Sequence, residues 1–345
     1  MANTSISNLS AGAAVSATDL VPNVQTVGVG PVKTTAAQLK TFMSASPTLV
    51  TPTLGVATAT SVNKITFTAP ATSATVTPTD GTTTVLSGGT LREVLTANRN
   101  YYVRTDGSDS NNGLANTAGG AFLTIQKAVN VVYSLDLSIY DVVINVATGT
   151  YTGNINVSLP YVGSGRIIIS GDTTTPTNVV ISTTGFAFSV TNKASLSIQG
   201  VSVTAASASA CINVTSGASV TLTGKTDFGA CASGHHVYVD AGYFFSAIAE
   251  TISGNVAGSH YYANNNGFIN CVSATWAASG SRSTGAFAQS SGGGAIYAFG
   301  NTSSGTFTGA RYYVALNGTI NTNGGGANYF PGNSAGSTAT GGQYA

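Results

Sequence analysis

Charge is the scarcest property of this sequence. Its 345 residues include 12 Lys and Arg and 11 Asp and Glu, so 7% are charged and the net charge is +1. A globular protein has roughly 25% charged residues. A chain this neutral has no electrostatic footprint for nucleic acid or an anionic membrane, and we expect neither as a partner. A soluble monomer normally keeps more surface charge, so the scarcity also predicts that much of the surface faces other copies of the chain.

Cysteine and long apolar runs are scarce as well. The three cysteines, Cys211, Cys231 and Cys271, have no metal-site spacing and no obvious disulfide partner, so we expect them to be small buried residues. No apolar run approaches the roughly 20 residues of a membrane-spanning helix. The first residues lack the basic region and apolar core of a signal peptide. We therefore expect no membrane insertion, no signal peptide and no cofactor.

The most prominent feature that the sequence does have is a repeat, which runs from about residue 185 to residue 323. In blocks of 25 counted from Ala210, the third position is always apolar or aromatic. The eighth position is always Gly or Asn, in the order Gly217, Gly242, Gly267, Gly292 and Asn317. Gly and Asn adopt positive φ at little cost, so this column predicts one left-handed corner per block.

Each block also contains two or three short runs of β-branched or alternating residues, and none shows a helical period. A period of this size is typical of a repeat architecture in which each block forms one coil. The pattern predicts an all-β fold, a right-handed parallel β-helix with coils of about 24–25 residues stacked roughly 4.8 Å apart.

The first 45 or so residues carry a different pattern. An Ile-x-x-Leu start is followed by a Leu-Val-Pro step, a hairpin and a Thr-x-x-Gln-Leu helix that continues to about Met43. This pattern resembles the N-terminal attachment unit of bacteriophage tail-fibre proteins. The resemblance implies that the unit anchors the chain to other virion proteins through the following residues: Ile6, Leu9, Leu20, Val21, Pro22 and Leu39.

A third pattern begins with Tyr101-Tyr-Val and continues through an Asp/Asn/Gly loop to a Thr-Ile-x-x-Ala helix. It resembles the beginning of the pectate-lyase-like β-helix superfamily, which is common among phage fibres and spikes. A helix that presents Ile125, Ala128, Val129 and Val132 can cover the open end of a β-helix. The Gly-rich C-terminus resembles the tip of phage fibre β-helices. Those fibres are homotrimers, so the resemblance implies a homotrimer.

These patterns divide the chain into five segments. They are a virion-attachment unit at 1–45, a Thr/Ala/Pro-rich shaft or linker at 46–98, a first strand, loop and capping helix at 99–136, the parallel β-helix at 137–323, and a Gly-rich tip at 324–345.

Glycoside hydrolysis needs a pair of carboxylates. Asp227 and Glu250 are the candidates in the regular coils, at offsets 17 and 15 of consecutive blocks. That spacing puts their Cα atoms roughly 8 Å apart on one face, a separation that suits an inverting hydrolase. The alternative is that both are solvated acids beside turns, and we assign no catalytic residue.

Two histidines, His235 and His260, share a column of the blocks, and His236 lies beside them. A metal site needs a third or fourth ligand, which three copies in a trimer can supply if this column lies near the axis. The alternative is a hydrogen-bonded corner. We expect no metal site within one chain, and His235 and His260 are the candidates for an ion in a trimer.

Aromatic residues gather in the last coils, where some must face the core or a subunit interface. The others, with nearby Asn side chains, can present flat faces and amides to a sugar. We predict Tyr261, Asn265, Trp276 and Tyr329 as the exposed glycan contacts.

The sequence therefore predicts a phage fibre or spike protein, made in the cytoplasm of the bacterial host and localised to the virion. Its trimeric β-helix would bind surface glycans of the host cell, with avidity from several weak sites. Two alternatives remain open. One is a tailspike-type polysaccharide depolymerase of the same architecture, and the other is a head fibre of the same fold.

Overall fold

The computed structural model of this chain describes residues 20–23, 32–35, 92–206 and 210–345. The chain divides into two units, Met1–Val85 and Leu86–Ala345. In the first unit, strand β1 (Leu20–Asn23) pairs in antiparallel fashion with β2 (Val32–Thr35).

Three of the predicted attachment residues, Leu20, Val21 and Pro22, lie in β1. The other three, Ile6, Leu9 and Leu39, lie outside the described residues, as does most of the helix expected up to Met43.

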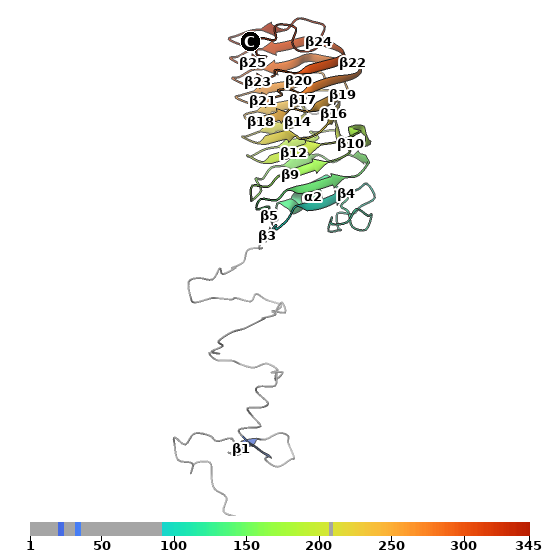
Figure 1. The fold of residues 1–345 in the computed structure, drawn as a ribbon, viewed down its shortest axis with the longest axis vertical. Helices are drawn as coiled ribbons and strands as arrows, with labels where there is room; N and C mark the ends of the chain where they lie inside the picture. Colours follow the sequence, from blue (N-terminus) through green and yellow to red (C-terminus); the bar gives the residue numbers. More distant parts are fainter. Residues whose placement is uncertain (1–19, 24–31, 36–91, 207–209) are drawn as a thin grey trace, which may run out of the picture. The chain divides into compact units, whose positions relative to one another are not determined.

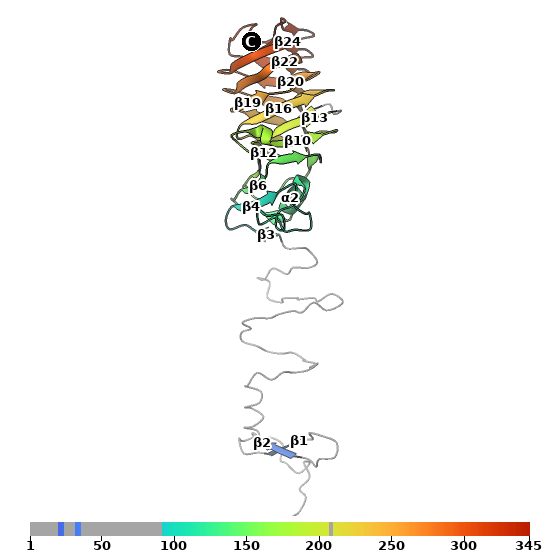
Figure 2. The same cartoon turned by 90° about the vertical axis from the view of Figure 1, so that its right-hand side faces the viewer.

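The second unit is a parallel β-solenoid of about eight turns (Figures 1 and 2). One face is a sheet of ten parallel strands, in which each strand pairs with its counterpart one turn away. In order, these strands are β4 (Arg99–Val103), β6 (Val142–Val146), β9 (Ile167–Ser170), β12 (Ser195–Gln199), β15 (Ser219–Leu222), β18 (Tyr243–Ser246), β21 (Phe268–Asn270), β23 (Ala295–Tyr297), β25 (Thr319–Asn321) and β27 (Gln343–Tyr344).

The other two faces belong to a second sheet, whose two rows of strands meet in the long strand β22 (Thr275–Ser290). The first row is β7 (Gly149–Tyr151), β10 (Val179–Thr183), β13 (Ser202–Ala205), β16 (Thr226–Cys231) and β19 (Ala249–Ile252). The second row is β8 (Ile155–Val157), β11 (Phe188–Val190), β14 (Ala210–Thr215), β17 (His235–Asp240) and β20 (Ser259–Asn264). Beyond β22, β24 (Thr302–Val314) and β26 (Ser337–Thr338) continue the stack.

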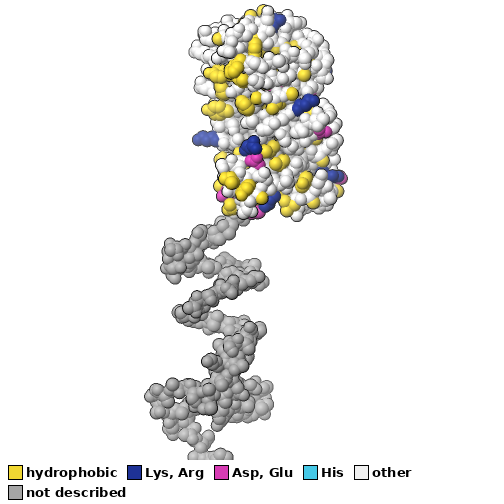
Figure 3. All heavy atoms as spheres, viewed as in Figure 1, with side chains coloured by type: hydrophobic (Ala, Val, Ile, Leu, Met, Phe, Trp, Pro, Cys, Tyr) yellow, Lys and Arg dark blue, Asp and Glu magenta, His cyan; other side chains and the backbone are white. Residues whose placement is uncertain are grey.

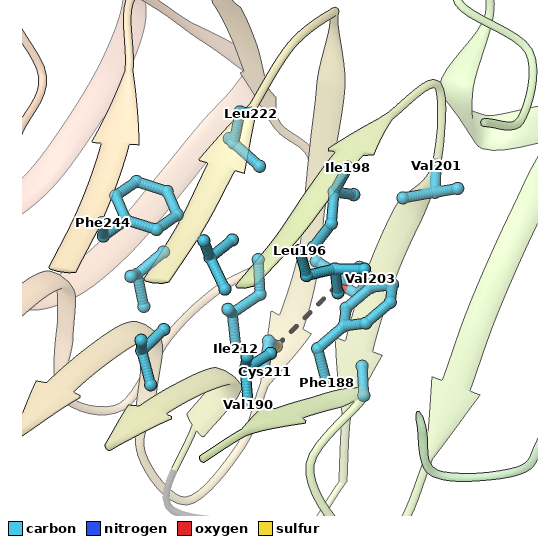
Figure 4. Close-up of a cluster of buried hydrophobic side chains, with 14 of the residues drawn as sticks. Phe188, Val190, Leu196, Ile198, Val201, Val203, Cys211, Ile212, Leu222 and Phe244 are labelled. Atoms are coloured by element: carbon cyan, nitrogen blue, oxygen red, sulfur yellow. Dashed lines mark hydrogen bonds between the residues drawn. The ribbon is translucent and has the colours of Figure 1, made fainter. Parts of the chain in front are cut away.

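The core is built from side chains that repeat from turn to turn. Ile144, Ile169, Ile198 and Leu222 are consecutive register partners in the ten-stranded sheet, and all four are buried. Figure 4 shows this packing around Phe188, Leu196 and Phe244, with side chains from all three faces pointing inward. Burying such a ladder of aliphatic and aromatic groups is the main favourable term for a fold with so few charges.

The predicted left-handed corner is present, but its register differs from the 25-residue blocks. Gly217, Gly292 and Asn317 have positive φ, of 75°, 58° and 58°. Gly242 and Gly267 are not among the positive-φ residues. At Gly267, a Cβ would lie 2.2 Å from the Val239 carbonyl oxygen, so that position needs Gly for space and not for φ.

Near its first turns the solenoid carries α2 (Ile125–Val132), the one α-helix among the described residues. Thr124 caps its N-terminus, and the helix buries Ile125, Ala128, Val129 and Val132 against β4, β6 and β8. Before the first turn, β3 (Glu93–Val94) pairs with β5 (Leu135–Asp136).

At the other end, the parallel stack continues past residue 323, where we expected it to stop. β26 pairs with β24, and β27 pairs with β25. Phe330, which is fully buried, packs against Trp276 and Phe287, and Tyr344 stacks on Tyr312 with ring centroids 3.7 Å apart. The Gly-rich tail is therefore part of the solenoid and closes its core.

Candidate functional site

The two acidic residues predicted as a catalytic pair do not form one. In the paired strands β16 and β19, Thr226 lies opposite Glu250 and Asp227 lies opposite Thr251, a step of 24 residues. Successive side chains of a strand point to opposite faces, so the Asp227 and Glu250 carboxyls lie on opposite sides of the sheet. The 25-residue block was one residue too long here, and a one-residue slip reverses the facing. Both residues are also 1% exposed, which excludes the alternative of solvated acids.

Asp227 is held beneath the outer surface of β16. Its Oδ2 accepts hydrogen bonds from the hydroxyls of Ser202 (2.6 Å) and Ser253 (2.7 Å). Its Oδ1 has no partner among the described residues. Burial raises the pKa of this carboxyl. The surroundings favour a structural acid over a solvent-accessible base.

Glu250 points into the core and lies at the centre of a buried polar chain. This chain consists of Gly229, His236, Ser246, Glu250, His260, Tyr261 and Trp276. On one side, Oε1 of Glu250 accepts hydrogen bonds from the Ser246 hydroxyl and, at 2.5 Å, from the Tyr261 hydroxyl. The Trp276 indole N–H donates to the Tyr261 oxygen at 3.2 Å.

On the other side, Oε2 of Glu250 lies 3.0 Å from Nε2 of His260. Nδ1 of His260 lies 2.9 Å from Nδ1 of His236, and Nε2 of His236 lies 2.9 Å from the Gly229 carbonyl oxygen. A carbonyl oxygen only accepts, so Nε2 of His236 carries a hydrogen. Burial lowers the pKa of His236 well below its ordinary value, so this ring is neutral and its Nδ1 accepts.

Nδ1 of His260 must then be the donor to His236, and one further proton lies between His260 Nε2 and Glu250 Oε2. Apart from the proton shared between His260 Nε2 and Glu250 Oε2, every hydrogen bond of the buried polar chain therefore has a determined direction. All its side chains are at most 1% exposed, so no substrate reaches them. We assign this chain to the stability of the solenoid and not to catalysis.

The histidine column predicted from the sequence is also shifted by one residue. His235 lies level with Ser259, whose backbone N–H donates to its Nδ1, and His236 is the partner of His260. Two nitrogens bound to one zinc ion lie roughly 3.3 Å apart by tetrahedral geometry. The His236 and His260 nitrogens, 2.9 Å apart, share a hydrogen instead. Among the described residues, no group of three His, Cys, Asp or Glu side chains can hold a metal ion.

The predicted glycan contacts are mostly not exposed. Tyr261 (0% exposed) and Trp276 (1%) lie in the core, so this prediction is wrong for both. Their polar atoms are used in the buried polar chain, and their rings fill the wide last turns. Tyr329 is half-buried, and its hydroxyl donates to the Asn301 side chain at 2.7 Å. Asn265 is exposed, at the corner between β20 and β21.

A different set of aromatic residues does reach the surface, and we call it the aromatic ladder. It consists of Tyr243, Phe245, Phe268, Tyr297 and Phe299, on and just after β18, β21 and β23. Tyr243 is 57% exposed, and Phe245 and Tyr297 are 42% and 41% exposed. Tyr243 and Phe268 are register partners, and the rings of Phe268 and Tyr297 meet edge to face with centroids 5.1 Å apart.

The ladder lies on the outer face of the ten-stranded sheet, where Figure 3 shows hydrophobic atoms gathered. The residues between its members, Phe244, Ile269 and Ile296, point inward and are buried. Strand alternation is the signal that would have found it, because Tyr243-Phe244-Phe245 cannot place all three rings in the core. β18, β21, β23 and β25 contain no charged residue, and Asn270 lies in register between Phe245 and Tyr297.

Within the described part of the chain, no helix is long and apolar enough to cross a membrane. A comparison of the chain with protein-family models and with curated proteins gives no match.

Proposed function

We propose that this chain is a fibre or spike protein of a bacteriophage virion that binds host-cell glycans as a trimer of right-handed β-helices. The observation that carries the proposal is the aromatic ladder, which lies on and just after strands that contain no charged residue. Its rings lie on three successive turns, which are roughly 4.8 Å apart, and they give a large contact area at low conformational cost. The Asn270 amide beside them, whose oxygen accepts from the Val272 backbone N–H, has N–H groups that can donate to sugar hydroxyls.

The rest of the chain supports this proposal through resemblance and composition. The N-terminal pattern of tail-fibre attachment units fits a role in anchoring the solenoid to other virion proteins, on the tail or on the head. Three copies, each with a weak glycan site, give avidity that one site does not supply. The scarcity of surface charge fits association of copies. The protein would be made in the host cytoplasm and act on the virion.

Nothing in the described residues favours the depolymerase alternative. The pair of carboxylates that motivated it lies on opposite sides of a sheet.

The test compares Tyr297→Ser with Tyr313→Ser, a matched control because Tyr313 is also exposed (38%) but lies on β24 outside the ladder. Each full-length protein is incubated with host capsule or lipopolysaccharide, the glycan is sized, and the mass of the protein is measured by light scattering. We expect a trimer that co-elutes with intact glycan, and at least about tenfold weaker binding for Tyr297→Ser alone, or about 1.4 kcal/mol.

Three other outcomes would contradict this proposal. Shortened glycan would identify a depolymerase. Loss of the trimer in Tyr297→Ser would assign the ladder to a subunit interface. Absence of any glycan binding by the unmodified protein would remove the proposed receptor class.

A further inference from the structure

A cleft lies beside α2, and the predicted functions make no use of it. It has a volume of about 350 Å³ and is lined by three segments of the first turn: Thr105, Leu123–Gln126 and Thr150–Asn154. We call it the α2 cleft. Thr105 also lines an adjoining cleft of about 380 Å³, together with Arg104, Asp106 and Ala147–Thr148.

Hydrogen bonds within the chain hold the walls of the α2 cleft in place. The Thr124 hydroxyl donates to Asp109 Oδ2 at 2.7 Å while it caps the helix. The Gln126 side chain accepts from the backbone N–H of Asn156 at 2.6 Å and donates to its carbonyl at 3.1 Å. The Tyr151 hydroxyl donates to a backbone carbonyl at 2.9 Å. The cleft is therefore formed before any ligand arrives, as in most small-molecule sites.

The rim of the α2 cleft also has polar groups that make no hydrogen bonds to the cleft walls. The hydroxyls of Thr105, Thr150 and Thr152 and the amide of Asn154 are exposed and have no hydrogen-bond partner elsewhere in the described residues. Between them, Leu123 is 43% exposed beside the buried Ile125. The cleft thus combines three free hydroxyls, one free amide and one apolar wall.

The ten lining residues include no Lys, Arg, Asp or Glu. In the adjoining cleft, the Arg104 guanidinium is paired with Asp106 through bonds of 2.8 and 3.0 Å, so its charge is balanced. A phosphorylated or carboxylated ligand would find no free cation in either cleft. The unused groups match a neutral ligand with many hydroxyls.

We propose that the α2 cleft binds one or two units of a neutral saccharide whose apolar substituent, such as an N-acetyl methyl group, packs on Leu123. A volume of about 350 Å³ lies at the lower end of the range for ligand sites, roughly 300–1,000 Å³, which sets the ligand size. This site is separate from the aromatic ladder and does not depend on glycan binding there.

The test fills the α2 cleft with a side chain that the backbone accepts. Gly153 lines the cleft, lacks positive φ, and a Cβ built on it meets no atom within 4 Å. Gly153→Leu should therefore fold normally and obstruct the cleft. Gly119→Leu is the matched control, because Gly119 has the same open surroundings and does not line the cleft. Equal thermal unfolding of both variants and the unmodified protein establishes that the fold is intact.

The probes are N-acetylglucosamine, glucose and glucuronic acid, with binding to the full-length protein followed by NMR titration. We expect N-acetylglucosamine to bind most tightly and glucuronic acid most weakly, and Gly153→Leu to reduce the affinity at least tenfold. Gly119→Leu and the ladder variant Tyr297→Ser should bind like the unmodified protein. Absence of binding at tens of millimolar sugar, unchanged binding in Gly153→Leu, or loss confined to Tyr297→Ser would each overturn the proposal.

Discussion

At the scale of single residues, the core changes character at Ser246. This residue follows Leu222 in the inward ladder of the ten-stranded sheet, where β6, β9, β12 and β15 carry only Ile or Leu. Its hydroxyl donates to Glu250. A polar group in a core is costly unless it is hydrogen-bonded, and each side chain of the buried polar chain has a hydrogen-bond partner.

Glu250 is the residue on which this matching depends, so its variants test the assigned hydrogen-bond directions. Glu250→Ala leaves buried partners at Ser246, His260 and Tyr261 without an acceptor, and we expect a loss of about 3–5 kcal/mol of unfolding free energy. Glu250→Gln keeps an oxygen for the two hydroxyls, and its amide can donate to Nε2 of neutral His260. We expect it to cost about 1 kcal/mol, as measured by denaturant unfolding.

The comparison of the two variants is the control. If Glu250→Gln were as damaging as Glu250→Ala, the charge of Glu250 and not the pattern of donors would be essential.

At the scale of elements, the length of each turn decides which side chains face inward. Turns of 24 and 25 residues are mixed in this solenoid, as the partners Thr226–Glu250 and Asp227–Ser202 show. The sequence showed the repeat, but it did not show which turns have 24 residues and which have 25. The paired carboxylates and the histidine column were misplaced for this reason.

The glycines of the corner allow a prediction at this scale. Gly267→Ala places a Cβ 2.2 Å from a backbone oxygen, and we expect a loss of about 1–3 kcal/mol from the forced shift. Gly217→Ala has room but keeps φ at 75°, so we expect about 1–2 kcal/mol. Gly119→Ala, in open surroundings, should cost less than about 0.5 kcal/mol in the same thermal and denaturant measurements. Equal stability of all three variants would contradict the assigned corner geometry.

At the scale of the whole molecule, stability should depend on pH through buried histidines. Burial lowers the pKa of His235 from 6.5 to about 4, and it also lowers the pKa of His236 well below its ordinary value. Below pH 6.5 the unfolded chain binds protons at these positions while the folded solenoid does not. Stability is therefore complete above pH 6.5 and falls as the pH drops toward 4, by about 1.4 kcal/mol per pH unit for each histidine.

Global unfolding in urea between pH 7.5 and pH 4.5 measures this slope. The acidic groups with lowered pKa, such as Asp106 and Asp141, act below this range. Asp227, whose pKa is raised by burial, opposes the histidine slope as the pH falls, so the slope is judged against that of a histidine variant. His235→Asn removes one titrating group. The slope of unfolding free energy against pH should therefore become shallower by about 1.4 kcal/mol per pH unit, which corresponds to one proton. Equal slopes for His235→Asn and the unmodified protein between pH 6.5 and pH 4.5 would show that the His235 ring is not buried as described.

Much of the architecture was accessible from the sequence by itself. The period of about 25 residues, the alternation of apolar positions and the recurring Gly and Asn corner predicted a parallel β-helix, because stacking identical turns buries identical columns. The structure has such a solenoid, and the four residues expected to form the apolar face of the helix at 125–132 are buried. These features are local or strictly periodic, so each can be read without knowing the register of distant strands.

Only the tertiary structure decided which side chains are at the surface. Tyr261 and Trp276 are buried while Tyr243 and Tyr297 are exposed, although all four lie in the same aromatic-rich stretch. The difference depends on the register of each turn and on the corners where two consecutive residues point inward. The α2 cleft likewise needs three segments from residues 105 to 154 to meet in space. A surface site is set by such non-local contacts, whereas the repeat that builds the scaffold is set by local sequence.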